Sequence, residues 1–194
     1  MISQSIKNLY FRLLQPLVRL LGRSGISPHA LTVVGFIISL GAAVCFGYGY
    51  FCWAGSLTLL AGVFDTLDGQ LARMTDQTTR FGAFFDSTLD RFSETAVLLG
   101  LMFFFITRQS SLALLVAVFI AASLMVSYTK ARAEGLGQEC TIGLMQRPER
   151  VMLLGIAAFF NLQVLIIILW ILTILTGYTV GERIMYISKR LMAK

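Results

Sequence analysis

The sequence is short of charge. Aspartate, glutamate, lysine and arginine make up 13% of its 194 residues, whereas a soluble globular domain carries about 25%. Hydrophobic residues make up 57%, and the mean hydropathy is +0.78. The apolar segments also lack the alternation of polar and apolar residues that a membrane β-barrel requires. The predicted fold class is therefore an all-α integral membrane protein, because lipid offers no partner for unpaired backbone groups.

Paired cysteines are missing as well. Cys45, Cys52 and Cys140 form no CxxC motif and no even set, so we expect reduced thiols that pack as small apolar side chains. The N-terminus has no cleavable small-residue site after an apolar core, and no internal repeat or polar linker is visible. We therefore expect a single domain over residues 1–194, without a signal peptide.

Apolar runs are what the sequence has in abundance. They cover residues 31–50, 51–64, 95–106, 112–126 and 151–180, and about twenty helical residues cross a hydrocarbon core about 30 Å thick. The last run is too long for one crossing, so we expect a break near residues 161–163 and a fifth helix that begins near Thr141. This division predicts six transmembrane helices within residues 27–180. Ser27 would cap the first helix, with Pro28 at its first position.

Basic residues favour one side of this arrangement. Of the sixteen lysines and arginines, Arg91 falls within the third crossing and only Arg108 is left for the opposite face. The positive-inside rule makes the basic side cytoplasmic, so we expect both termini and a basic tail, residues 181–194, on that side of a prokaryotic plasma membrane. Residues 1–23 predict an amphipathic helix in the headgroup region. Its apolar positions recur at helical spacing: Ile2, Ile6, Leu9, Leu13, Leu17 and Leu20.

Four aspartates stand among apolar residues, at Asp65, Asp68, Asp86 and Asp90. The first two are three residues apart and the last two are four apart, so each pair shares one face of its helix. The two helices run antiparallel around the loop at 73–80, which puts both pairs at a similar depth, about 12 Å along each helix. Small residues on the same faces are expected to let the two backbones approach closely: Gly69, Ala72 and Gly82.

Converging carboxylates in a partly desolvated cleft need compensating charge. Hard divalent ions with oxygen ligands, Mg²⁺ or Mn²⁺, would supply it, and two such ions would still attract a diphosphate. One alternative is that the aspartates form purely structural pairs with Arg73, Arg80 and Arg91. Another is a cation transporter, but a transport pathway expects polar groups along the full depth of the bundle. Here the acidic residues crowd one half, with Glu94 the nearest exception.

The stretch DTLDGQLARMTDQTTRFGAFFDSTLD, residues 65–90, resembles the CDP-alcohol phosphotransferase pattern D-x2-D-G-x2-A-R-x8-G-x3-D-x3-D at every fixed position. The resemblance implies that an acceptor hydroxyl attacks the β-phosphorus of a CDP-linked lipid, usually CDP-diacylglycerol, and that CMP leaves. It also implies two divalent ions, a homodimer, no nucleic-acid partner, and Asp90 as general base. The implied metal ligands are Asp65, Asp68, Asp86 and Asp90. The implied nucleotide contacts are Asp65, Asp68, Gly69, Ala72, Arg73 and Thr32.

A second group of polar residues bears on the acceptor. It lies at the expected cytoplasmic ends of the fourth and fifth crossings and comprises Ser127, Lys130, Arg132, Arg147 and Arg150. The segment RPER, residues 147–150, presents two arginines at a helix start, which suits a phosphate. Ordinary positive-inside charge is the alternative explanation.

The segments KARAE and QRPER are similar to those of the phosphatidylinositol phosphate synthase branch. That resemblance implies inositol phosphate as the acceptor, its phosphate gripped by the basic residues of the second group. Glycerol 3-phosphate, which would give phosphatidylglycerol phosphate, is the main alternative, and an archaeal-type lipid donor stays open.

Overall fold

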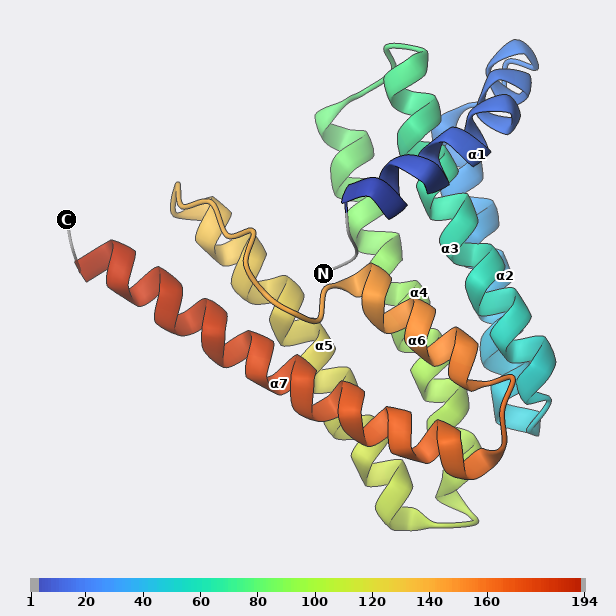
Figure 1. The fold of residues 1–194 in the computed structure, drawn as a ribbon, viewed down its shortest axis with the longest axis vertical. Helices are drawn as coiled ribbons and strands as arrows, with labels where there is room; N and C mark the ends of the chain where they lie inside the picture. The colour runs from blue at the N-terminus through green and yellow to red at the C-terminus, as the bar shows by residue number, and fades with distance from the viewer. Residues whose placement is uncertain (1–3, 193–194) are drawn as a thin grey trace.

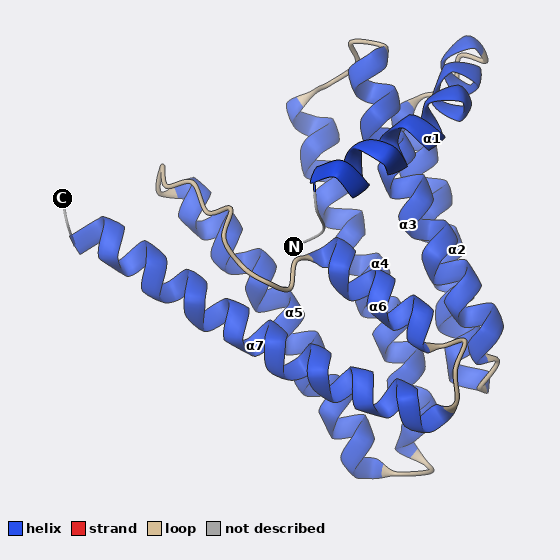
Figure 2. Cartoon of the chain, viewed as in Figure 1, coloured by secondary structure: helices blue, strands red, loops and turns tan. Residues whose placement is uncertain are grey.

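The computed structural model describes residues 4–192, which form seven α-helices joined by loops, with no strand among them (Figures 1 and 2). Three of these helices, α2 (Pro28–Tyr48), α5 (Ser110–Gly135) and α7 (Leu162–Met192), are long and apolar enough to cross a membrane. The others are α1 (Gln4–Arg23), α3 (Phe51–Met74), α4 (Arg80–Ile106) and α6 (Arg147–Ala157). The predicted all-helical membrane class is thereby confirmed.

The ends of α2 follow the sequence signals. Ser27 caps the helix by accepting a hydrogen bond from the Ala30 N–H at 3.3 Å, and Pro28 occupies the first turn. Gly49 ends the helix in the left-handed region at φ 82°, which a glycine adopts without a steric cost. Thr79 caps the start of α4 in the same way as Ser27 caps α2: its hydroxyl accepts a hydrogen bond from the Gly82 N–H at 2.9 Å.

The predicted start of the fifth crossing is wrong. Helix α6 begins at Arg147 rather than near Thr141 and has 11 residues, a length of about 16 Å. Gly143, at φ +126°, and Pro148 in the first turn account for this, since a proline has no N–H to donate to a preceding helical turn. Helix α7 continues as one helix of 31 residues to Met192 and so includes most of the predicted basic tail, residues 181–194.

The helices pack around α2 and α5. Helix α2 lies against both α3 and α4, α5 lies against α4 and α7, and α6 lies against α3 and α7. The predicted close approach of the α3 and α4 backbones is therefore wrong: both helices pack against α2, and α3 and α4 approach each other through their side chains. Gly82 instead leaves room for α2: a Cβ atom there would lie 2.9 Å from Cε1 of His29.

Helix α1 crosses the end of the bundle that carries the α3–α4 loop (Figure 1). Val18 is buried there against Leu31, Leu67 and Leu71. Leu17 and Leu20, from the predicted apolar face, are instead 41% and 64% exposed. Ile2 lies outside the described residues, and the side chains of Ile6, Leu9 and Leu13 are not described either. The described part of α1 thus has one apolar stripe on the bundle and a second that faces outward.

Two glycines allow α3 and α6 to pack closely. A Cβ atom on Gly55 would lie 2.6 Å from the carbonyl oxygen of Gly155, and overpacking of this kind costs about 1–3 kcal/mol. We expect Gly55→Ala to lower the thermal unfolding midpoint in detergent. Gly177→Ala is the matched control, because no atom lies within 4 Å of a Cβ there. Equal midpoints for the two variants would contradict the close packing.

Candidate active site

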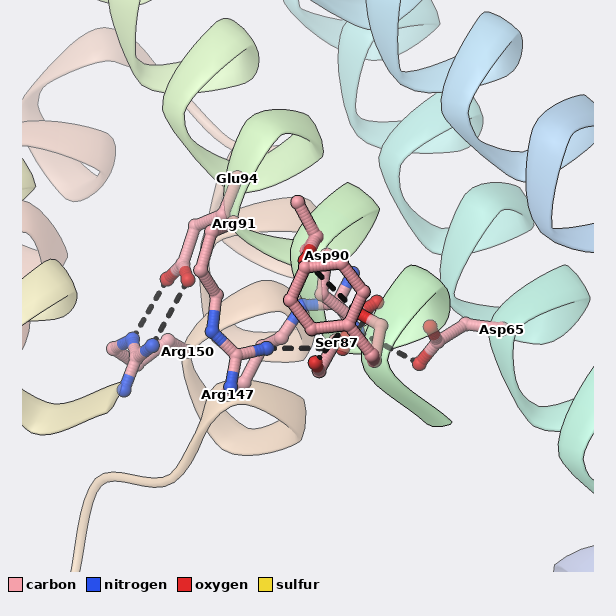
Figure 3. A network of polar contacts seen from close by, with 9 residues as sticks. Asp65, Ser87, Asp90, Arg91, Glu94, Arg147 and Arg150 are labelled. Carbon is pink, nitrogen blue, oxygen red and sulfur yellow. Dashed lines mark hydrogen bonds and ion pairs between the residues drawn. The ribbon is translucent and has the colours of Figure 1, made fainter. Parts of the chain in front are cut away.

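Carboxylates from two helices meet between α3 and α4. Asp65 of α3 and Asp86 and Asp90 of α4 each place one oxygen within 4.8 Å of the others. Asp86 and Asp90 are one turn apart on α4, and Asp65 faces Asp90 from α3 (Figure 3). We call these three residues the aspartate cluster. Three carboxylate oxygens at this spacing form the kind of donor set that a hard divalent ion takes.

Asp68 lies beside this cluster. Its side chain is 4% exposed, and its Oδ2 atom has no hydrogen-bond partner among the described residues. Asp86 Oδ1 is likewise buried without a partner. A buried acceptor without a partner is costly, and a bound cation would remove that cost. The residues present therefore fit a divalent metal ion.

Arg147, at the start of α6, supplies the main positive charge at the cluster. Its Nη1 atom lies 2.8 Å from Asp65 Oδ2 and 2.7 Å from Asp90 Oδ1 (Figure 3). Arg91 adds a contact of 3.2 Å to Asp90. Of the structural pairs considered from the sequence, Arg91 alone forms an ion pair with these aspartates within the described residues. The principal partner is instead Arg147, which the sequence predicts as a phosphate ligand.

Arg150 lies deeper than Arg147 and has different partners. Its side chain is 1% exposed, and its Nε and Nη2 atoms donate to the two oxygens of Glu94 at 2.7 and 2.9 Å. Its Nη1 donates to the carbonyl of Met145 at 2.9 Å. From the sequence, Glu94 is predicted only as an exception to the crowding of acidic residues in one half of the bundle. Its position one turn after Asp90, on the same helical face, was the signal for its place beside the site.

The loop at 136–146 leads from α5 back toward the middle of the bundle, where α6 begins (Figure 1). Arg183 of α7, 3% exposed, donates to the carbonyls of Ile142, at 2.9 Å, and of Val126. Thr179 accepts from the Met145 N–H at 3.2 Å. Side chains thus satisfy backbone groups that a helix would have paired internally. The sequence predicts Arg183 in the basic tail, and Thr176, Thr179 and Arg183 recur at helical spacing along one face of α7.

The other residues implied by the resemblance lie in three places. Thr32 of α2 lines the same pocket as Asp65, Asp68, Asp90 and Arg147. Gly69, Ala72 and Arg73 occupy the last turns of α3, where a Cβ on Gly69 would lie 3.6 Å from Arg73 Nη2. Ser127, Lys130 and Arg132 lie near the end of α5, where Lys130 pairs with Glu134 at 3.7 Å. In the described chain, Arg147 is thus the one predicted phosphate ligand in contact with the aspartate cluster.

In an all-helical membrane protein, a pocket that gathers carboxylates and arginines suits an enzyme that acts on phosphorylated substrates with divalent ions. The comparison with known families agrees: the family model for CDP-alcohol phosphatidyltransferase matches residues 26–185. The chain belongs to the CDP-alcohol phosphatidyltransferase family.

Its relatives narrow the comparison. The chain is 35% identical to the phosphatidylinositol phosphate synthase of Mycobacteroides abscessus over 182 residues, which is 90% of this chain and 83% of the relative. It is also 35% identical to the archaetidylinositol phosphate synthase of Pyrococcus horikoshii, over 91% of this chain and 93% of that protein.

Solved structures of the Mycobacterium tuberculosis phosphatidylinositol phosphate synthase resemble the fold closely. The structure with CDP-DAG bound is 31% identical, with a TM-score of 0.82 over 91% of this chain and 94% of that one. The structure in complex with manganese and citrate gives the same TM-score and identity over 89% of this chain and 87% of that one.

Proposed function

We propose that this protein transfers a phosphatidyl group from CDP-diacylglycerol to the hydroxyl of inositol phosphate, giving phosphatidylinositol phosphate and CMP. One observation carries this proposal: a single pocket is lined by Asp65, Asp68 and Asp90 together with Arg147. Carboxylates serve the metal-assisted chemistry of a diphosphate, and an arginine serves recognition of a phosphate. The similarity to inositol phosphate lipid synthases supports the choice of acceptor.

The proposed roles of the residues combine the family resemblance with their positions in the pocket. Two Mg²⁺ or Mn²⁺ ions would be held by Asp65, Asp68, Asp86 and Asp90. When bound, such ions would neutralise the negative charge of the lipid diphosphate and of the departing phosphate. Asp90 accepts the proton of the acceptor hydroxyl. The oxygen then forms its bond to the β-phosphorus, and the bond to CMP breaks. The cytidine nucleotide would lie against α2 and α3, held by Thr32, Gly69, Ala72 and Arg73.

The acceptor phosphate would bind at Arg147. A guanidinium that contacts both Asp65 and Asp90 can hold a phosphate on its remaining donors. The acceptor hydroxyl is thereby kept beside Asp90, and orientation of this kind lowers the barrier by making the encounter intramolecular. Ser127, Lys130 and Arg132 would approach the same phosphate from α5, across the loop at 136–146. Arg150, which is bound to Glu94, would act on this phosphate indirectly.

The arrangement in the membrane is part of the proposal. Six crossings, α2 to α7, would place α1, both termini and the aspartate cluster at the cytoplasmic face of a prokaryotic plasma membrane. Helix α6 is shorter than a crossing, and the loop at 141–146 would supply the rest. Non-helical backbone is tolerated at that depth only where protein groups satisfy it, as Arg183 and Thr179 do here. Leu17 and Leu20 of α1 would face lipid, and two chains would form a homodimer.

The test uses purified protein in lipid vesicles with CDP-diacylglycerol. Labelled inositol phosphate, glycerol 3-phosphate and serine are supplied one at a time, and the lipid product and CMP are measured. We expect a labelled lipid from inositol phosphate, with CMP release that stops on chelation by EDTA and returns with Mg²⁺ or Mn²⁺. A product from glycerol 3-phosphate instead would identify a phosphatidylglycerol phosphate synthase. Turnover with a CDP-linked ether lipid alone would reassign the donor.

A further inference from the structure

Glu94 of α4 and Arg150 of α6 are buried charges beside the active site that make no contact with the aspartate cluster. Glu94 lies one turn after Asp90 of the cluster on α4, and Arg150 lies one turn after Arg147 on α6 (Figure 3). We propose that Glu94 is a positioning residue, which acts through Arg150 to hold the first turn of α6 so that Arg147 stays between Asp65 and Asp90. The inference rests on the proposed role of Arg147 as the ligand of the acceptor phosphate.

Two ion pairs join α4 to α6 one turn apart. In the first, Arg147 Nη1 lies 2.7 Å from Asp90 Oδ1. In the second, Arg150 binds both oxygens of Glu94, with Nε at 2.7 Å and Nη2 at 2.9 Å. Asp90 and Glu94 are four residues apart and Arg147 and Arg150 are three apart, so each helix presents both partners on one face. A shift of α6 along or around its axis would therefore move both pairs together.

The second pair is the more rigid of the two. The side chains of Arg150 and Glu94 are 1% and 8% exposed, whereas that of Arg147 is 17% exposed. A two-point contact between a guanidinium and a carboxylate also fixes orientation as well as distance. The Glu94–Arg150 pair is thus suited to act as the fixed point, and the Arg147 contact as the one that substrate can reach.

The other constraints on this end of α6 include the pair of Arg147 with Asp65 of α3 and the hydrogen bond from the Met145 N–H to Thr179 of α7. Helix α6 packs mainly against α3 and α7, and its N-cap residue, Gln146, makes no capping hydrogen bond through its side chain. Arg150 also fixes the loop, because its Nη1 atom donates to the carbonyl of Met145, two residues before the helix begins. One guanidinium therefore connects α4, the loop and α6. Without Glu94, that guanidinium would lose the partner that holds it in place.

A positional role makes a selective prediction. The proposed donor and metal contacts come from α2, α3 and α4, and only the acceptor contact at Arg147 comes from α6. Loss of Glu94 should therefore weaken the acceptor step and spare the others. Misplacement by about 1 Å can cost about 100-fold in rate, so the effect should be large enough to measure.

The experiment compares Glu94→Gln with the wild type, using whichever phosphorylated acceptor the wild type turns over. We expect the acceptor KM to rise by about tenfold or more, and the KM for the CDP-linked lipid to stay the same. Mn²⁺ affinity, measured by electron paramagnetic resonance without turnover, should rise as it does in Arg147→Ala, because a displaced Arg147 no longer competes for Asp65 and Asp90. Glu94→Asp, which keeps the charge, should recover part of the loss. In an Arg147→Ala background, Glu94→Gln should add nothing further to the acceptor KM, because residues that act as one unit are not additive.

A second variant guards against misfolding. Glu94→Leu combined with Arg150→Met removes both charges, a replacement that often leaves stability unchanged, and thermal unfolding shows whether the fold persists. It should raise the acceptor KM as Glu94→Gln does. A folded variant with the wild-type acceptor KM would overturn the inference, and so would additive losses in the Arg147→Ala background. A wild type that turns over no phosphorylated acceptor would refute the proposed function instead.

Discussion

Asp90→Asn should nearly abolish CMP release, with kcat lowered by about 10²–10⁴-fold, the range that a general base contributes. An amide has the shape of the carboxylate but cannot take the proton of the acceptor hydroxyl. Asp90 is also held in place by two arginines, Arg147 at 2.7 Å and Arg91 at 3.2 Å. An asparagine oxygen can still accept from these donors, so the geometry around position 90 should persist. The measurement is CMP release at saturating metal ion and both substrates.

Saturating metal ion matters because Asp90 is also a proposed metal ligand, so the variant should bind Mn²⁺ more weakly. Asp76→Asn is the matched control. Asp76 lies in the exposed turn between α3 and α4 with φ 52°, a conformation that asparagine adopts as readily as aspartate. We expect wild-type activity from it. If Asp90→Asn kept wild-type kcat at saturating Mn²⁺, the base would have to be another group.

The aspartate cluster could be predicted from the sequence because its geometry is local. Spacings of three and four residues place carboxylates on one helical face whatever the helix packs against. Charges are also rare enough in this chain for the pattern to stand out. The packing around the cluster is not local. The close approach predicted for α3 and α4 is wrong because α2 packs against both of them. The residue spacing within two helices carries no information about a third helix that packs against them.

The ends of α2 and α6 show the same contrast. Ser27, Pro28 and Gly49 each act on adjacent backbone, so α2 begins and ends where these residues lie. For α6, hydropathy favoured an early start that would fill a whole crossing. Gly143 and Pro148 prevented it, and the chain reaches the bundle interior as a loop instead.

The buried partners of the loop were the hardest to predict. Arg183 and Ile142 are 41 residues apart, and Glu94 and Arg150 are 56 residues apart. Contacts at such separations depend on the assembled bundle rather than on any local pattern. A charge at regular spacing in an apolar helix was nevertheless a usable sign of a buried contact, and Glu94 and Arg183 both carry it.

Arg147→Ala should change two properties in opposite directions. For the acceptor, kcat/KM should fall about 30- to 4,000-fold. That range corresponds to a loss of about 2–5 kcal/mol in interaction free energy, the cost of truncating one partner of a buried charge contact. For the metal ion, affinity should rise, because Arg147 competes for Asp65 and Asp90, which it contacts at 2.8 and 2.7 Å. The metal-free variant should also unfold at a lower temperature, since those carboxylates lose their counter-charge, and Mn²⁺ should restore more of its stability than in the wild type.

The opposite signs distinguish this effect from general misfolding, which would weaken the binding of both substrates and of the metal ion together. Arg190→Ala is the control: Arg190 lies at the exposed end of α7, where its guanidinium sits 4.5 Å from the centre of the Tyr186 ring, and its loss should alter neither quantity. An unchanged acceptor kcat/KM in Arg147→Ala would remove the phosphate ligand from the proposed site. A guanidinium that only offsets the charge of the aspartates is displaced when the metal ion binds, so its removal should strengthen binding of the ion. Weaker Mn²⁺ binding in Arg147→Ala would therefore mean that Arg147 orders the aspartates for the metal ion and does not compete with it.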